Sequence, residues 1–91
     1  MNLPKPSNAE IAEVLERLAA LMEARDSNGV NRYRVRAYRQ AARTVERNEK
    51  DIAGLAMSDN EKDLESLPDI GKSIASTIRE FVGTGRLRLL E

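Results

Sequence analysis

The sequence predicts an all-α fold, a compact bundle of four to five short helices. Apolar residues recur with the spacing of helix faces, and no stretch alternates apolar and polar residues as a strand does. One Phe, two Tyr and no Trp leave an aliphatic, alanine-rich core, which suits packed helices better than a sheet. A chain of 91 residues forms one small domain around a single core.

Composition excludes several kinds of site. The chain has no Cys, which excludes disulfides and thiolate metal sites, and no His, the commonest metal ligand and general base. The N-terminus lacks an apolar signal region and no window reaches the length of a membrane span. We therefore expect a soluble, cytoplasmic protein that does not contact a membrane.

The net charge is zero, but the charges are unevenly distributed. Residues 32–50 carry seven basic and two acidic residues, and residues 71–91 carry four and two. Residues 1–31 carry three basic and five acidic residues, and residues 51–70 carry one and six. The molecule is therefore expected to have a basic side.

The first helix is predicted over residues 8–24, after an extended leader over residues 1–7. Ser7 to Glu10 has the form of a capping box. The apolar stripe behind it consists of Ile11, Val14, Leu15, Leu18, Leu21 and Met22.

A second helix is predicted over residues 32–47, after turn-forming residues 26–31, with Asn31 as its N-cap. Its inward face consists of Val35, Tyr38, Ala41, Ala42 and Val45. A weaker helix is expected over residues 50–56. A second capping box at residues 58–61 is expected to start a short helix through Leu64.

Residues 67–75, Leu-Pro-Asp-Ile-Gly-Lys-Ser-Ile-Ala, predict a tight hairpin between two helices. Pro68 ends the preceding helix, and Gly71 supplies the positive φ that reverses the chain. The last helix follows over residues 72–84, with Gly85 as its C-terminal cap. Unpaired N–H groups at its start favour an anion, so the hairpin is predicted to hold a DNA phosphate.

Five arginines of the second helix recur at steps of 4, 3, 4 and 4 residues and share one face. They are Arg32, Arg36, Arg39, Arg43 and Arg47. Arginine suits phosphate because its planar fork donates two parallel hydrogen bonds. The alternative is a solvated face, or pairing with Glu10, Glu13, Glu16 or the acidic residues 59–65. The hairpin in the same chain favours phosphate contact.

These segments resemble the amino-terminal helix-hairpin-helix domain of family X DNA polymerases, the polymerase beta type and especially its bacterial branch. The resemblance rests on residues 8–21, on the Arg-Tyr-Arg-Val-Arg-Ala-Tyr-Arg-Gln-Ala-Ala-Arg run at 32–43, on the hairpin at 67–75 and on Thr-Gly-Arg-Leu at 84–87. It covers residues 8–91 and implies one helix-hairpin-helix motif in a domain that grips the 5′ side of a DNA gap or nick.

The resemblance also implies a set of site residues. Arg34 and Tyr38 would line a 5′-phosphate pocket, with Arg39 and Lys72 nearby. The wider phosphate-binding set adds Arg32, Arg36, Arg43, Gly71 and Ser73. A monovalent cation, Na⁺ or K⁺, would bind the backbone carbonyls of Glu65, Leu67 and Ile70, and no other cofactor is expected.

Enzymatic activity is not expected. The chain ends before any polymerase palm, so the magnesium-binding aspartates of that domain are missing. Some family members are 5′-deoxyribose phosphate lyases that use a lysine Schiff base, but the matching position is Thr77, and a second family lysine corresponds to Ser73. Lys72 is the one possible substitute. Lyase activity through Lys72 therefore stays open as an alternative function.

Our prediction is a sequence-nonspecific DNA-binding module for gapped, nicked or 5′-phosphorylated DNA in DNA repair. We expect a monomer associated with the nucleoid, either a stand-alone protein or a piece that acts beside polymerase domains. Asp69 stands where such hairpins carry glycine, and its carboxylate would repel phosphate. A protein-interaction module that has lost DNA binding is therefore a further alternative.

Overall fold

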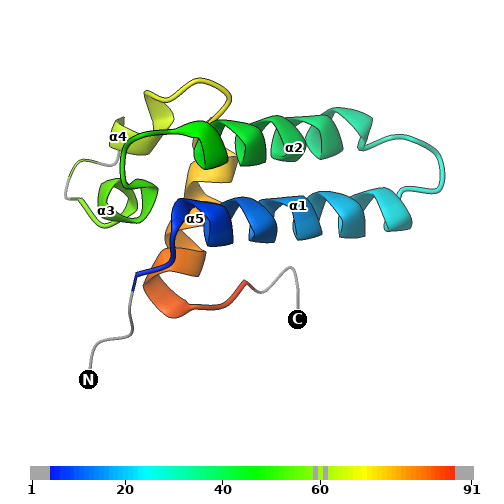
Figure 1. The fold of residues 1–91 in the computed structure, drawn as a ribbon. Coiled ribbons are helices and arrows are strands. Elements are labelled where there is room, and N and C mark those ends of the chain that lie inside the picture. Colours follow the sequence, from blue (N-terminus) through cyan, green and yellow to red (C-terminus); the bar gives the residue numbers. More distant parts are fainter. Residues whose placement is uncertain (1–4, 59, 61, 88–91) are drawn as a thin grey trace.

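The computed structural model describes residues 5–58, 60 and 62–87, and within them it has five helices and no strand (Figure 1). The helices are α1 (Asn8–Arg25), α2 (Arg32–Arg47), α3 (Ile52–Ala56), α4 (Lys62–Glu65) and α5 (Lys72–Thr84). The predicted all-α bundle of four to five short helices is confirmed. The last helix has the predicted bounds, and α1 is one residue longer than expected.

The start of α1 has the predicted capping box. The Glu10 backbone N–H donates to Ser7 Oγ at 3.1 Å, and the Ser7 N–H donates to Glu10 Oε1 at 3.2 Å. Each bond satisfies a backbone donor that the first helical turn leaves without a partner. The local sequence therefore specified where α1 begins.

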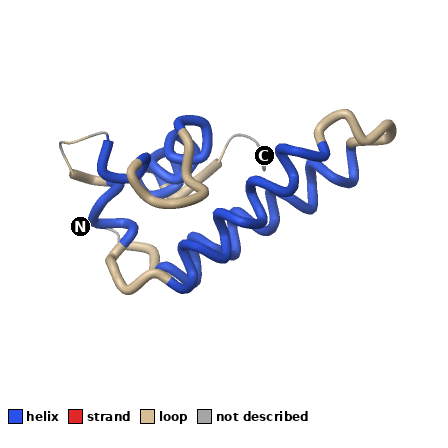
Figure 2. The backbone as a smooth tube through the Cα atoms, turned by 90° about the horizontal axis from the view of Figure 1, so that it is seen from above, coloured by secondary structure: helices blue, strands red, loops and turns tan. Residues whose placement is uncertain are grey.

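The helices α1 and α2 form an antiparallel pair, and α5 crosses behind them (Figure 1). In the view from above, α1 and α2 run side by side and project away from the shorter helices (Figure 2). The residues of α2 that are buried in this arrangement are the five predicted from the 3.6-residue period. They are Val35, Tyr38, Ala41, Ala42 and Val45.

All the helices share one hydrophobic core. Seven of its 19 buried apolar residues are alanines and Tyr38 is its single aromatic residue, so the expected aliphatic, alanine-rich core is present. The radius of gyration is 12.8 Å. That value is close to the ~12 Å typical of a compact domain of this length, which agrees with a single core.

Two predicted helix starts differ from the structure. Asn31 is the N-cap of α2, but its side chain makes no capping bond, and its backbone N–H instead donates to Asp26 Oδ2 at 3.0 Å. The helix α3 begins at Ile52, two residues later than expected, because the Ile52 N–H donates to Asn8 Oδ1 at 3.0 Å. A contact with α1 thus decides where α3 starts.

Several predictions concern residues outside the described ranges. The extended leader includes residues 1–4, and the second capping box includes Asp59 and Glu61. The described part of that box shows Ser58 Oγ donating to Asp63 Oδ2 at 2.7 Å, and α4 begins at Lys62. None of the helices in the described part of the chain is long and apolar enough to cross a membrane.

Candidate nucleic-acid interface

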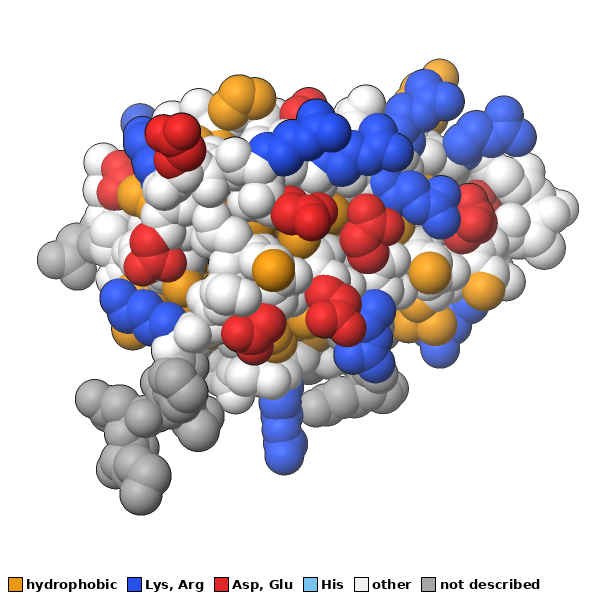
Figure 3. Space-filling model, viewed as in Figure 1, with side chains coloured by type: hydrophobic (Ala, Val, Ile, Leu, Met, Phe, Trp, Pro, Cys, Tyr) orange, Lys and Arg blue, Asp and Glu red, His pale blue; other side chains and the backbone are white. Residues whose placement is uncertain are grey.

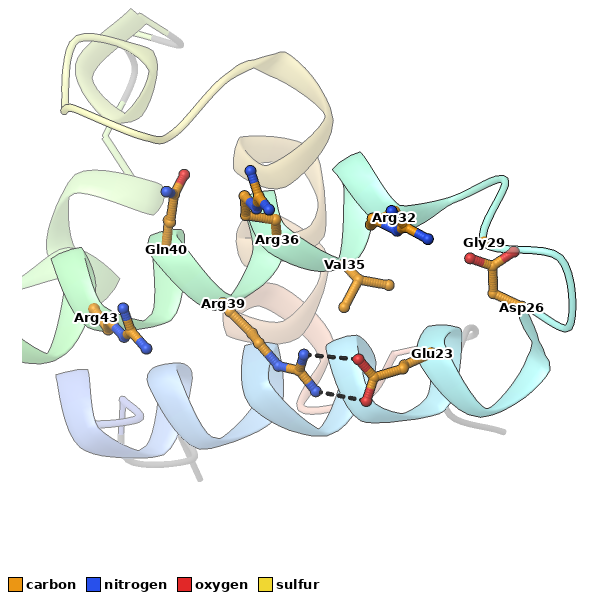
Figure 4. A pocket seen from close by; sticks show the side chains of 9 residues that line it. All are labelled: Glu23, Asp26, Gly29, Arg32, Val35, Arg36, Arg39, Gln40 and Arg43. Atoms are coloured by element: carbon orange, nitrogen blue, oxygen red, sulfur yellow. Dashed lines mark hydrogen bonds and ion pairs between the residues drawn. The ribbon is translucent and has the colours of Figure 1, made fainter.

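The arginine face of α2 borders a groove of about 560 Å³ between α2 and the C-terminal half of α1 (Figure 4). Four of the five predicted arginines line it: Arg32, Arg36, Arg39 and Arg43. Arg47 lines an adjoining hollow nearer the hairpin. Figure 3 shows basic side chains gathered over α2 and acidic side chains below them over α1. The predicted basic side is therefore present, with an acidic border.

One arginine of the groove is already paired with a carboxylate. Arg39 Nη1 and Nη2 donate to Glu23 Oε2 and Oε1 at 2.9 and 3.1 Å (Figure 4). These hydrogen bonds, with the attraction between the charges, lower the pKa of Glu23 from its ordinary value of 4.5. The same hydrogen bonds and the charge of Glu23 raise the pKa of Arg39 above its ordinary value. The pair is exposed and joins α1 to α2.

The other arginines of this face make no ion pair with any described residue. Sequence reasoning offered pairing with Glu10, Glu13, Glu16 or residues 59–65 as the alternative to phosphate contact. Within the described ranges, the structure instead pairs a single member of the face, with Glu23. Among the residues that the structure describes, four guanidinium groups on about four helical turns therefore have no carboxylate partner and are open to an anion.

The hairpin between α4 and α5 lies against the C-terminal half of α2. Thr44 Oγ1 donates to Asp69 Oδ2 at 2.9 Å, so the hairpin tip is held on the helix that carries the arginines. Asp69 and Arg47 line a hollow of about 190 Å³. Gln40 and Arg43 line both this hollow and the larger groove. The fold therefore joins the hairpin and the arginine face into one surface.

The residue that reverses the hairpin is not the one predicted. Gly71 has φ −87° and ψ −176°, which any residue adopts, whereas Asp69 has φ 66°. Aspartate tolerates the left-handed region better than most residues, and here the bond from Thr44 holds it there. The prediction that Gly71 supplies the positive φ was wrong. Gly71 is instead the N-cap of α5.

Lys72 and Ser73 form the exposed first turn of α5, directly after the exposed Gly71. The N-cap of α5 has no side-chain capping bond. The first backbone N–H groups of the helix therefore depend on water or a ligand for their hydrogen bonds. This geometry agrees with the predicted place for an anion, and it puts Lys72 beside it.

Tyr38 does not line a phosphate pocket in this structure, contrary to the expectation from the resemblance. Its side chain is buried and only 2% exposed. Thr77 Oγ1 donates its single hydrogen to Ser73 O at 3.1 Å, so the Tyr38 hydroxyl is the donor in its 3.0 Å contact with Thr77 Oγ1. Tyr38 therefore ties α2 to α5 inside the core and is closed to a ligand in this structure. Arg34 is exposed but lines neither the groove nor the hollow.

With this geometry established, the chain can be compared with known proteins. Residues 6–87 match the profile of the helix-hairpin-helix domain. The chain belongs to this family. It is 32% identical over 82 residues to the DNA polymerase/3′-5′ exonuclease PolX of Bacillus subtilis (strain 168). That match covers 90% of the chain and 13% of PolX, so the chain spans a small part of its relative.

The matched region confirms the resemblance to a family X polymerase domain. Thr77, which the resemblance matches to a lyase lysine of the family, is a buried, hydrogen-bonded core residue. Lys72 is five residues earlier, at the exposed start of α5. A lysine amine is activated for Schiff-base chemistry by burial or by a neighbouring charge. Lys72 is exposed, so burial does not activate its amine.

The expected cation ligands lie in the hairpin and at the end of α4. The Leu67 carbonyl already accepts the Ile70 N–H at 3.3 Å, which leaves it one lone pair for an ion. Glu65 is the last residue of α4, and Ile70 precedes the α5 N-cap. No group of three or more Asp or Glu among the described residues is arranged to hold a metal ion. A cation here would therefore depend on backbone oxygens.

Sequence reasoning missed two polar residues of this interface, Glu23 and Thr44. A signal for Glu23 was present: in an antiparallel helix pair joined by a short loop, facing residues have numbers with a nearly constant sum. The loop-side ends Arg25 and Arg32 sum to 57, so this rule places Glu23 opposite residue 34, about 7.5 Å along the axis from Arg39 and within reach of its long side chain. No comparable signal marked Thr44, because its partner Asp69 is 25 residues away beyond two other helices.

Proposed function

We propose that this helix-hairpin-helix domain is a sequence-nonspecific DNA-binding module that contacts the phosphate backbone. The observation that carries the proposal is the joined surface, in which the Asp69–Thr44 bond holds the hairpin on the arginine-bearing helix. Phosphates would meet Arg32, Arg36 and Arg43 along the groove, and Gly71, Lys72 and Ser73 at the start of α5. In this proposal these groups contact phosphates and not base edges, so the contacts would position DNA without specifying its sequence.

The preferred DNA in this proposal is gapped or nicked and carries a 5′-phosphate, and the proposed role is in DNA repair. The support is the sequence similarity to a DNA polymerase and the anion-favouring start of α5. We propose that the module binds DNA as a monomer in the nucleoid-associated part of the cytoplasm.

The test is fluorescence anisotropy with a short gapped duplex, with and without the 5′-phosphate, at low and moderate salt. Contacts with four or five phosphates would give a slope of log affinity against log salt of about −4. Removing one contact by Arg36→Gln should make this slope shallower by about 1. Arg17→Gln, an exposed change on α1 outside both hollows, is the charge-matched control.

Failure to bind DNA at low salt would favour the protein-interaction alternative, for which the carboxylates of Glu23, Asp26 and Asp69 in the basic groove are the supporting feature. The lyase alternative is tested by borohydride trapping on an abasic 5′ end. Trapping that Lys72→Ala abolishes would establish an enzyme in place of a binding module.

A monovalent cation at the hairpin belongs to the same proposal, with Glu65, Leu67 and Ile70 offering backbone oxygens. Replacing K⁺ by tetramethylammonium at constant ionic strength should weaken DNA binding, because the larger ion does not fit between carbonyls. Unchanged affinity would remove the cation from the proposal and leave the phosphate contacts in place.

A further inference from the structure

The acidic border of the groove is as well defined as its basic side. The carboxylates of Glu13, Glu16 and Glu23 are exposed along α1, which packs beside α2. Glu23 holds Arg39, and the charge of Glu16 also acts on Arg39. Figure 3 shows acidic side chains bordering the basic ones on this face. The groove is therefore positive on the α2 side and negative on the α1 side.

The distance between the two sides is small compared with the width of DNA. Packed helices lie about 8–10 Å apart, so a phosphate contact on α2 lies within about one Debye length of the α1 carboxylates at 0.1 M salt. A straight duplex laid on the arginine face therefore brings its other phosphates over these carboxylates. Like charges across an interface oppose binding and select against that arrangement.

An interrupted duplex can avoid the repulsion. An intact duplex is stiff, with a persistence length of about 150 bp, whereas the protein is 42 Å in its longest dimension. A gap or nick removes this stiffness at one point. The DNA can then bend there, keep its phosphates on α2 and on the α5 N-terminus, and turn away from α1.

We infer that the carboxylates of Glu13 and Glu16, exposed on α1 beside the groove, are specificity determinants that make this face reject a straight duplex in favour of an interrupted one. The inference rests on the proposed function and deepens it, because it assigns the preference for gapped or nicked DNA to named side chains. The preference arises from repulsion of the wrong DNA in addition to attraction of the right one.

The test compares affinities for an intact duplex and for the same duplex with a gap, both without a 5′-phosphate, at 0.05–0.1 M salt. The variant is Glu13→Gln with Glu16→Gln, which leaves the Glu23–Arg39 pair and the capping box intact. The control is Glu49→Gln with Asp51→Asn, which removes the same charge from exposed residues that follow the C-terminal end of α2 and are not on α1.

Each neutralised carboxylate about 10 Å from a phosphate should raise affinity for the intact duplex about 1.4-fold, from Coulomb's law in water with screening over about one Debye length. The Glu13/Glu16 variant should therefore bind the intact duplex about 2-fold more tightly and raise the affinity for the gapped duplex by a smaller factor. The control should raise both affinities equally and keep the preference. Thermal melting of each variant checks that the fold is kept, and Glu16→Gln alone should give half the effect on a logarithmic scale.

Two results would overturn the inference while leaving the proposed function standing. One is an equal rise in affinity for the intact and the gapped duplex in the Glu13/Glu16 variant, which would be a general effect of net charge. The other is an unchanged preference of this variant for the gapped duplex, which would place the two carboxylates outside the DNA-binding surface. Wild-type protein that binds neither DNA would instead refute the proposed function itself, so the two failures are distinguishable.

Discussion

Replacing Asp69 by asparagine should raise DNA affinity without loosening the hairpin. Asp69 has φ 66° and accepts a 2.9 Å hydrogen bond from Thr44 Oγ1. Asparagine also tolerates the left-handed region, and its amide oxygen also accepts from a hydroxyl. The substitution therefore keeps the geometry and removes the negative charge beside Arg43 and Arg47.

The size of the effect follows from the charge that is removed. A phosphate about 8 Å from this carboxylate is repelled by about 0.5 kcal/mol in water and about 2 kcal/mol at an effective dielectric constant of 20. Screening at 0.1 M salt favours the lower part of this range. We expect Asp69→Asn to bind DNA about 2–5-fold more tightly, and its thermal stability to change by less than about 0.5 kcal/mol.

Fluorescence anisotropy titrations and thermal melts measure both quantities, with Asp51→Asn as a control that removes an equal charge outside both hollows. Asp69→Ala separates conformation from charge, because alanine at this φ costs about 1–2 kcal/mol. Unchanged or weaker binding by Asp69→Asn at low salt would show that phosphates do not pass the hairpin tip. That result would refute the proposal that the hairpin and the arginine face bind DNA as one surface.

Four further predictions test the fold. Asn8→Ala should lower the free energy of unfolding by about 2–3 kcal/mol in denaturant, because the Asn8 side chain loses three hydrogen bonds of 2.8–3.1 Å to the α2–α3 loop and the start of α3. A change below about 0.5 kcal/mol would show that these three hydrogen bonds do not stabilise the fold. Thr77→Val should cost about 1–3 kcal/mol because it leaves the buried Tyr38 hydroxyl without its acceptor, and adding Tyr38→Phe should recover part of the loss. No recovery in the double variant would refute this coupling. Leu18→Ala, at a fully buried position, should cost about 2–5 kcal/mol, and near-wild-type stability would place Leu18 outside the core. Glu23 has a lowered pKa, so its stabilising effect should be present above pH 4.5 and be lost as the pH falls through the lowered pKa. Glu23→Gln should therefore have a lower melting temperature than wild type at pH 6, and the difference should shrink as the pH falls below 4.5. Equal melting temperatures at pH 6 would show that this ion pair adds no stability.

Helix positions and faces were predictable because their signals are local. The capping box at Ser7, the left-handed Gly85 that ends α5 and the buried face of α2 all follow from residues within two turns of one another. The same holds for the arginine face of α2. The residue that takes the positive φ was misplaced at Gly71, because two residues of one hairpin compete for it and Asp69 has it.

The sequence alone therefore determined the all-α class, the helix faces and the presence of a basic stripe near a hairpin. Only the tertiary structure decided that Arg39 is paired with Glu23, that Asp69 is held by Thr44 and that Tyr38 is closed inside the core. These contacts join residues 16–39 positions apart. Helical period fixes where each side chain points, but which side chain it meets depends on how separate helices pack.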